Sequence, residues 1–226
     1  MLRASRRSLA ALALAAGLSA LLGGLAAGPA AADDKTLVQA LRAGGLVIVL
    51  RHGATSADQV DAEPVDFDNI AAQRNLNDKG KAAAVAFGNA FRQIGIPVGK
   101  VYTSRFNRAY ETAMLAEFRE IEKTPDLTYA KSAASPDKNI TNAEAFRKLL
   151  GTAPQPGTNT VLVTHTPNIV DALGKDWAEV KEGEASIFRP ANGNYTLVAR
   201  VQMDDWPRIA AEIGRASCRE RVSYHV

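Results

Sequence analysis

Two apolar segments of this chain are continuous rather than alternating, and each of them ends at a histidine. Leu46 to Leu50 reads LVIVL and runs into Arg51 and His52. Val161 to Val163 leads in the same way to His165. A strand without polar alternation suits a sheet that is covered on both faces, which is the usual setting of parallel strands flanked by helices. These segments therefore restrict the chain to a layered α/β fold.

Apolar residues at helical spacing separate these strands. Helices are predicted over 35–43, 77–95, 105–118 and 141–150, with a fifth starting at Pro167; strands are predicted over 99–104 and in a late hairpin, 184–190 with 195–202. Asn77 fits an N-cap, and Thr141 with Glu144 fits a capping box. Strands alternating with helices predict a three-layer α/β/α sandwich with a mostly parallel central sheet.

Residues 1–32 have the pattern of a signal peptide. Three arginines precede a leucine- and alanine-rich run that ends in Ala30-Ala31-Ala32. We expect cleavage before Asp33, a periplasmic or secreted protein, and no stable membrane insertion of the mature chain. Glycines interrupt the apolar run, which disfavours an uncleaved anchor. The paired arginines in SRRSLA leave both Sec and twin-arginine export open.

Residues 213–226 break the apolar patterning and resemble the translation of a sequencing-library adapter. We treat them as a suspected non-native tail, so that 33–212 is the expected domain. The single cysteine, Cys218, lies in this tail, and no disulfide or thiol nucleophile is expected in the domain. The whole chain carries a charge of +3; without the three arginines of the leader and the net two positive charges of the tail it carries −2. This charge balance gives no reason to expect a nucleic-acid partner.

The chemistry-bearing residues gather where the predicted strands end. Ligands of such sheets bind beyond the carboxyl ends of the strands. If the two apolar strands are neighbours, His52 and His165 meet at one edge of the sheet. The strand 99–104 delivers Arg105 and Arg108 to the same edge, where the start of the following helix also favours an anion.

This set of side chains suits a compact dianion, and a phosphoryl group fits best. Arg51 and Arg108 supply fixed N–H donors, and Gly53 leaves room for close backbone approach. Taken singly, a histidine at a strand end is commonly structural, and an arginine at a helix start is commonly solvated. Their placement at equivalent points of three βα units is what favours a site.

Three blocks resemble the histidine phosphatase superfamily of phosphoglycerate-mutase-like fold: LRHG at 50–53, VYTSRFNRAYETA at 101–113 and VLVTHTPNI at 161–169. The resemblance spans roughly residues 46–198. It implies that His52 is the nucleophile that takes the phosphoryl group, and that Arg51, Arg108 and His165 hold its oxygens. Such chemistry needs neither a metal nor another cofactor, and the sequence offers no cluster at metal-ligand spacing.

The physical chemistry of these residue types agrees with those roles. A neutral imidazole can attack phosphorus in line if an acceptor holds its other nitrogen and so fixes the tautomer. Arginines present fixed N–H forks to the equatorial oxygens. We expect His165, facing a dianion, to be protonated and to act as a further donor.

The sequence also departs from the family pattern. Arg105 stands where proline is frequent; it is either an extra cation for an acidic substrate or a solvated residue. Ala54 replaces the common Glu or Ser after the RHG motif, and Thr55 is a candidate substitute in the phosphate pocket. Thr166 follows the second histidine where the acid-phosphatase branch has Asp, which disfavours that branch.

The general acid that protonates the leaving oxygen is then expected in the segment SPDKNITNAE. Asp137 is the first candidate, and Glu144 is the second because the capping box already explains it. The predicted function is that of an exported, metal-independent phosphomonoester hydrolase acting on a small-molecule or envelope phosphomonoester. The alternative is an exported phosphate- or phospho-ligand-binding protein of the same fold without turnover. A phosphoglycerate mutase is disfavoured because export separates it from its substrate, and the oligomeric state is left open.

Overall fold

The computed structural model describes residues 33–129 and 136–222. Its single sheet has six strands: β1 (Val47–Arg51), β2 (Val98–Thr103), β3 (Ile121–Lys123), β4 (Asn159–Thr164), β5 (Glu184–Ala191) and β6 (Asn194–Gln202). Their order across the sheet is β3-β2-β4-β1-β5-β6. The first four strands run parallel, and the hairpin of β5 and β6 adds two antiparallel strands beside β1. The predicted mostly parallel sheet and the late hairpin are both confirmed.

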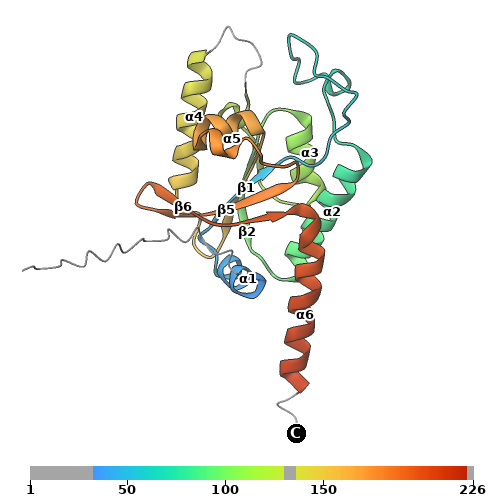
Figure 1. Cartoon of the computed structure of the whole chain (residues 1–226), viewed down its shortest axis with the longest axis vertical. Coiled ribbons are helices and arrows are strands. Elements are labelled where there is room, and N and C mark those ends of the chain that lie inside the picture. Colours follow the sequence, from blue (N-terminus) through green and yellow to red (C-terminus); the bar gives the residue numbers. More distant parts are fainter. Residues whose placement is uncertain (1–32, 130–135, 223–226) are drawn as a thin grey trace, which may run out of the picture. The chain divides into compact units, whose positions relative to one another are not determined.

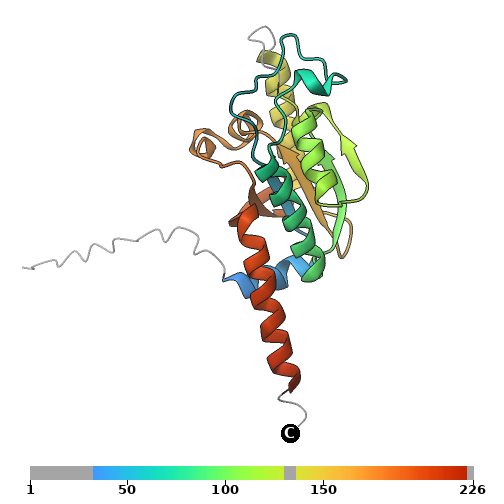
Figure 2. The same ribbon diagram turned by 90° about the vertical axis from the view of Figure 1, so that its right-hand side faces the viewer.

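Helices cover both faces of the sheet (Figures 1 and 2). They are α1 (Asp34–Ala43), α2 (Asp78–Gln93), α3 (Asn107–Leu115), α4 (Pro136–Gly151), α5 (Thr166–Leu173) and α6 (Trp206–Val222). Apolar side chains of α1, α2, α3 and α6 form one core with the sheet, and those of α4 and α5 form the other. The predicted three-layer α/β/α sandwich is therefore confirmed.

The position of β1 in the sheet accounts for its continuous apolar sequence. Ile48 and Leu50 face the core under α1 and α2, whereas Val47 and Val49 face the core under α4 and α5. Each of these side chains is buried, because β1 lies in the interior of the sheet between β4 and β5. A polar residue on either face of β1 would lie in a hydrophobic core.

The pairing of β1 with β4 aligns the two histidine motifs. The strands are parallel, with Arg51 opposite Thr164. The backbone N–H of His52 then donates to the Thr164 carbonyl (3.2 Å), which continues the ladder one residue past the strands. His52 and His165 therefore leave the sheet at the same level and on neighbouring strands.

The start of α2 packs against the loop that follows His52. Asn77 caps the helix as predicted, since its side chain accepts from the Gly80 N–H (2.8 Å). The Asn77 amide also donates to the Thr55 carbonyl (3.0 Å), which ties the cap to the loop. Gly80 lies so close that a Cβ atom there would meet the Ala54 carbonyl oxygen at 2.1 Å.

The predicted capping box at Thr141 and Glu144 is wrong. The helix α4 begins five residues earlier, at Pro136, so Thr141 lies inside it and its hydroxyl donates back to the Asp137 carbonyl (2.9 Å). Proline suits a first helical turn because it has no N–H to leave unpaired, and threonine can bond to the carbonyl four residues back inside a helix. Thr141 and Glu144 therefore have the spacing of a capping box although both lie in the interior of α4.

Two elements escaped the sequence patterns: the three-residue strand β3 and the helix α6. Trp206 opens α6 and packs against Phe91 and Phe87 of α2, with ring centroids 4.7 and 5.8 Å apart. The helix continues through the predicted boundary at residue 212 and ends at Val222. In the described ranges, no helix combines the length and the apolar character needed to cross a bilayer.

Gly80→Ala should destabilise the fold by about 1–3 kcal/mol, because the new methyl group meets fixed backbone of the loop after His52. Denaturant unfolding followed by circular dichroism measures this change. Gly214→Ala in α6 is the control, since its nearest neighbour would be a flexible Gln93 side chain at 3.9 Å, and it should stabilise by up to about 1 kcal/mol. A Gly80→Ala variant as stable as the unsubstituted chain would contradict the close approach.

Candidate active site

The two histidines meet at the carboxyl edge of the sheet, as the sequence indicated. Their ring centroids are 5.0 Å apart, and both side chains are buried. Phe106 and Tyr129 each present a ring edge-on to His165, with centroids 5.1 Å away. The pair of imidazoles thus lies between the sheet edge and a small aromatic cluster.

The tautomer of His52 follows from its hydrogen bond. Its Nδ1 lies 2.8 Å from the carbonyl oxygen of Gly53, and a carbonyl oxygen can only accept. Nδ1 therefore carries the proton of the neutral ring, and Nε2 keeps a free lone pair. This is the arrangement that an attacking imidazole requires.

Both imidazoles are neutral in the free protein. Burial lowers the pKa of His52 well below its ordinary value of 6.5, and the nearby Arg108 guanidinium lowers it further. The pKa of His165 is lowered in the same way, first by burial and then by His52 and Arg108. Neither ring nitrogen of His165 has a hydrogen-bond partner within the described residues. An anion placed beside His165 would oppose these effects and raise its pKa.

Arg108 lies in the first turn of α3 and is fully buried, close enough to both imidazoles for its charge to lower their pKa values. Its guanidinium lies over the Phe106 ring, 4.2 Å from the centroid. Nη1 and Nη2 both donate to the carboxylate of Asp61, at 2.8 and 3.3 Å. Asp61 belongs to the polar loop 57–73, which lies beside the site and sends the side chains of Asp61 and Gln73 into the interior.

Arg51 lies at the end of β1 and is partly buried. Its Nη1 donates to the Val180 carbonyl (2.6 Å), and Nη2 lies 3.6 Å from Glu182 Oε1. The same carboxylate accepts from the Thr55 hydroxyl (2.6 Å) and from the Thr55 N–H (3.3 Å). Both donors of Thr55, a predicted phosphate contact, are therefore engaged by Glu182, which the sequence did not single out.

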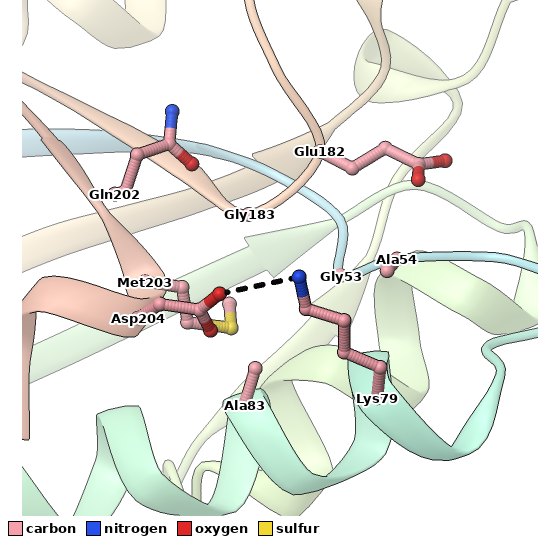
Figure 3. A pocket seen from close by; sticks show the side chains of 9 residues that line it. All are labelled: Gly53, Ala54, Lys79, Ala83, Glu182, Gly183, Gln202, Met203 and Asp204. Atoms are coloured by element: carbon pink, nitrogen blue, oxygen red, sulfur yellow. Dashed lines mark ion pairs between the residues drawn. The ribbon is translucent and has the colours of Figure 1, made fainter.

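Gly53 allows the loop after His52 to approach α2. Its N–H donates to Thr112 Oγ1 (3.0 Å), and a Cβ atom would meet the Gly80 carbonyl oxygen at 3.0 Å. A small hollow lies beside this backbone, between α2 and the β5–β6 hairpin. Figure 3 shows its lining residues, with Lys79 reaching 3.6 Å from Asp204 while the Glu182 side chain points away toward Ala54. Neither histidine lines it, so the hollow is separate from the imidazole pair.

Arg74 is a site residue that the sequence patterns missed. Its backbone is fixed at the site, because its N–H donates to Asp61 (2.8 Å) and its carbonyl accepts from Arg108 (3.2 Å). Its half-buried guanidinium has no hydrogen bond or ion pair in the part of the chain that the structure describes, and its charge lowers the pKa of both imidazoles. In the sequence, Arg74 directly follows the polar loop 57–73 and belongs to no recognisable motif, so no sequence pattern identified it.

The two predicted proton donors, Asp137 and Glu144, make no described contact with the histidines or arginines of the site. Both side chains are exposed on α4. Arg105 precedes α3 and is exposed, with its guanidinium 4.3 Å from the centroid of Phe67. Among the described residues, no three His, Cys, Asp or Glu side chains form a group that could hold a metal ion.

Several polar atoms of this site are buried without a hydrogen-bond partner among the described residues. Within the described residues, Nε of Arg51, Nε of Arg108 and both ring nitrogens of His165 are buried and unpaired. Buried polar groups are nearly always hydrogen-bonded, and leaving one unpaired costs about 1–3 kcal/mol. An anion with several oxygens would accept from the cationic N–H groups of the two arginines and from the single N–H of the neutral His165 ring.

The fold and the site together define an α/β protein with two histidines and several arginines at the carboxyl edge of its sheet. Residues 47–130 match the sequence model of the histidine phosphatase superfamily (branch 1). The matched residues include Arg51, His52 and Arg108 and end before His165. The chain therefore resembles the histidine phosphatase superfamily over these residues, which make up less than half of its length. A comparison with curated protein sequences finds no match.

Solved structures with the same fold include the protein histidine phosphatase SixA complexed with tungstate. It is 17% identical, with a TM-score of 0.52 over 71% of this chain and 98% of that one. Phosphoserine phosphatase from Entamoeba histolytica, in complex with 3-phosphoglyceric acid, is 13% identical, with a TM-score of 0.50 over 70% of this chain and 98% of that one. At these identities, both structures support the fold.

The buried histidines should make stability depend on pH. In the unfolded chain both imidazoles regain a pKa near 6.5, so below that pH the unfolded state binds protons that the folded state does not. The free energy of unfolding should therefore be highest above about pH 7 and fall by up to about 1.4 kcal/mol per pH unit and per histidine as the pH drops below about 6.5. Denaturant unfolding at pH 7.5, 6.0 and 5.0 measures it. His165→Gln should weaken the slope, and a flat profile would contradict the neutral, buried rings.

Arg74→Ala should weaken the binding of orthophosphate by about tenfold or more, because a charge-assisted hydrogen bond contributes about 1.5–3 kcal/mol. Isothermal titration calorimetry at fixed ionic strength measures this affinity. Arg119→Ala removes the same charge and is the control, because Arg119 is exposed and precedes β3, at the edge of the sheet opposite the strand ends that carry the site. Equal affinities of the two variants would show that Arg74 contributes only a general positive potential.

Proposed function

We propose that this protein is a metal-independent phosphomonoester hydrolase that works through a covalent phosphohistidine on His52. The observation that carries the proposal is the hydrogen bond from Nδ1 of His52 to the Gly53 carbonyl, which leaves Nε2 free beside unpaired arginine donors. A buried, neutral imidazole with a fixed tautomer is prepared to attack phosphorus. The family match over His52 and Arg108 supports the same role.

In the first step, Nε2 of His52 attacks the phosphorus in line and the bond to the leaving oxygen breaks. Charge stays on the three equatorial oxygens, where N–H groups of Arg51, Arg108 and Arg74 can hold it. His165 is neutral in the free protein, and the bound dianion raises its pKa so that it becomes a further donor.

In the second step, a water oxygen attacks the phosphohistidine and the bond between phosphorus and Nε2 breaks. Orthophosphate leaves, and His52 returns to the neutral form with its proton on Nδ1. The leaving oxygen of the first step needs a proton, and Asp137 and Glu144 remain the sequence predictions for its source. Both lie on α4, which packs on the face of the sheet opposite α3.

The substrate class proposed here is a phosphomonoester, either a small molecule or a phosphorylated component of the cell envelope. The predicted signal peptide supports an exported, periplasmic or secreted enzyme; residues 1–32 lie outside the described part of the chain. The solved phosphatase structures of the same fold are compatible with small phosphorylated substrates but do not choose among them.

The purified mature protein should hydrolyse a generic aryl phosphate in the presence of EDTA, and His52→Ala should abolish this activity. Arg108→Ala should lower kcat/KM on the order of a thousandfold, by analogy with other arginines that stabilise phosphoryl transfer. Release of phosphate measured at steady state, with acid-labile phosphoprotein measured after quenching in base, tests both steps.

Activity that survives His52→Ala would exclude the covalent mechanism. Loss of activity with EDTA would exclude independence from metals. A protein that binds orthophosphate without turnover would instead be a phospho-ligand-binding protein of the same fold. A loss below about tenfold in Arg108→Ala would remove that arginine from the pocket.

A further inference from the structure

The hydrogen bonds of Arg108 leave one side of its guanidinium open. Of its five N–H groups, Nη1 gives two, to Asp61 Oδ1 (2.8 Å) and to the Arg74 carbonyl (3.2 Å). Nη2 gives two more, to Asp61 Oδ2 (3.3 Å) and to the Tyr129 hydroxyl (3.2 Å). The remaining donor, Nε–H, is buried and has no partner among the described residues. Only this edge of Arg108 can take a new acceptor without breaking an existing bond.

The carboxylate of Asp61 fixes which edge that is. Its two oxygens accept hydrogen bonds from Nη1 and Nη2, and its side chain is almost as inaccessible to solvent as that of Arg108. The Phe106 ring supports the guanidinium plane from one face. With the end and one face held, rotation of Arg108 about its last bonds would break two charge-assisted hydrogen bonds.

The loop that carries Asp61 is itself attached to the start of α3, where Arg108 lies. The N–H of Asn107 donates to Gln73 Oε1 (2.9 Å), and Phe67 packs edge-on against Phe106 with centroids 5.1 Å apart. The Arg105 guanidinium covers the Phe67 ring. The position of Asp61 therefore does not depend on its ion pair alone, which favours a fixed support over a group that swings away.

We propose that Asp61 is a positioning residue, whose carboxylate holds the end of the Arg108 guanidinium so that the Nε edge is presented to the phosphoryl oxygens. The proposal rests on the proposed function of the same site. It also assigns a role to the polar loop 57–73, which connects the first histidine motif to α2. Asp61 neutralises the charge of Arg108 while leaving one of its donors for the substrate.

The matched variants are Asp61→Asn and Asp58→Asn. Both remove one negative charge from the same loop, but Asp58 is exposed. Asp61→Asn places an amide N–H against Nη2, so Arg108 should turn. We expect kcat/KM to fall about ten- to hundredfold, as for small misplacements of a reacting group. We expect the affinity for orthophosphate to fall about tenfold, and Asp58→Asn to stay within about twofold of the unsubstituted protein on both measures.

A double-mutant cycle tests whether Asp61 acts through Arg108. In an Arg108→Ala background, Asp61→Asn should change phosphate affinity and kcat/KM by less than about twofold, because the group it positions is gone. An undiminished effect in that background would overturn the proposal.

Two other outcomes would also overturn it. If Asp61→Ala binds orthophosphate more tightly than the unsubstituted protein, Asp61 competes with the substrate for Arg108. If the folded Asp61→Asn protein is less stable but keeps its kcat and KM, the ion pair is only structural. Should Asp61 variants fail to fold, Phe67→Ala, which loosens the loop but keeps the carboxylate, should still weaken phosphate binding several-fold; unchanged binding would contradict the proposal.

The orthophosphate titration separates this proposal from the proposed function. A protein without turnover would refute the hydrolase, while the phosphate affinities of the Asp61 and Asp58 variants would still decide whether Asp61 positions Arg108. Conversely, an active enzyme whose phosphate affinity is indifferent to Asp61→Asn would keep the hydrolase and refute the positioning role.

Discussion

The parallel pairing of β1 with β4 is the constraint on which the site depends. These strands are far apart in the sequence, yet their register places Arg51 opposite Thr164, so the residues that follow leave the sheet together. The backbone bond from His52 to Thr164 fixes the first imidazole at the level of the second. A shift of this register by one residue would turn the apolar side chains of β1 to the wrong faces and separate the histidines, so the packing of the core and the geometry of the site are the same requirement.

Electrostatics distinguish this sheet edge from an ordinary one. Arg51, Arg74 and Arg108 surround two buried imidazoles, and their positive charge helps to keep both rings neutral. Such an arrangement is costly without counter-charges, and the structure supplies two carboxylates. Asp61 pairs with Arg108 in the interior, and Glu182 lies between Arg51 and Thr55 nearer the surface. The remaining unpaired N–H groups are those available to a phosphoryl group.

Much of the fold could be predicted because it depends on patterns of residues that are close together in the sequence. Continuous apolar runs predicted interior strands, and apolar residues at helical spacing predicted helices on both faces. The prediction failed where one pattern had two physical readings. Thr141 and Glu144 fit a capping box, but Thr141 bonds equally well to a carbonyl inside a longer helix. The helix α6 was not predicted because the role of its first residue, Trp206, depends on packing against the aromatic rings of α2, which the sequence does not show.

The sequence by itself determined the two histidine motifs, the arginine block around the start of α3 and the α/β class, because each depends on residues that are neighbours in the chain. Only the tertiary structure decided which charged groups complete the site. Asp61, Arg74 and Glu182 come from polar segments without periodicity, and loops of that kind are placed by the surfaces they pack against. The same holds for Asp137 and Glu144, because their positions follow from where α4 begins and which face of the sheet it covers.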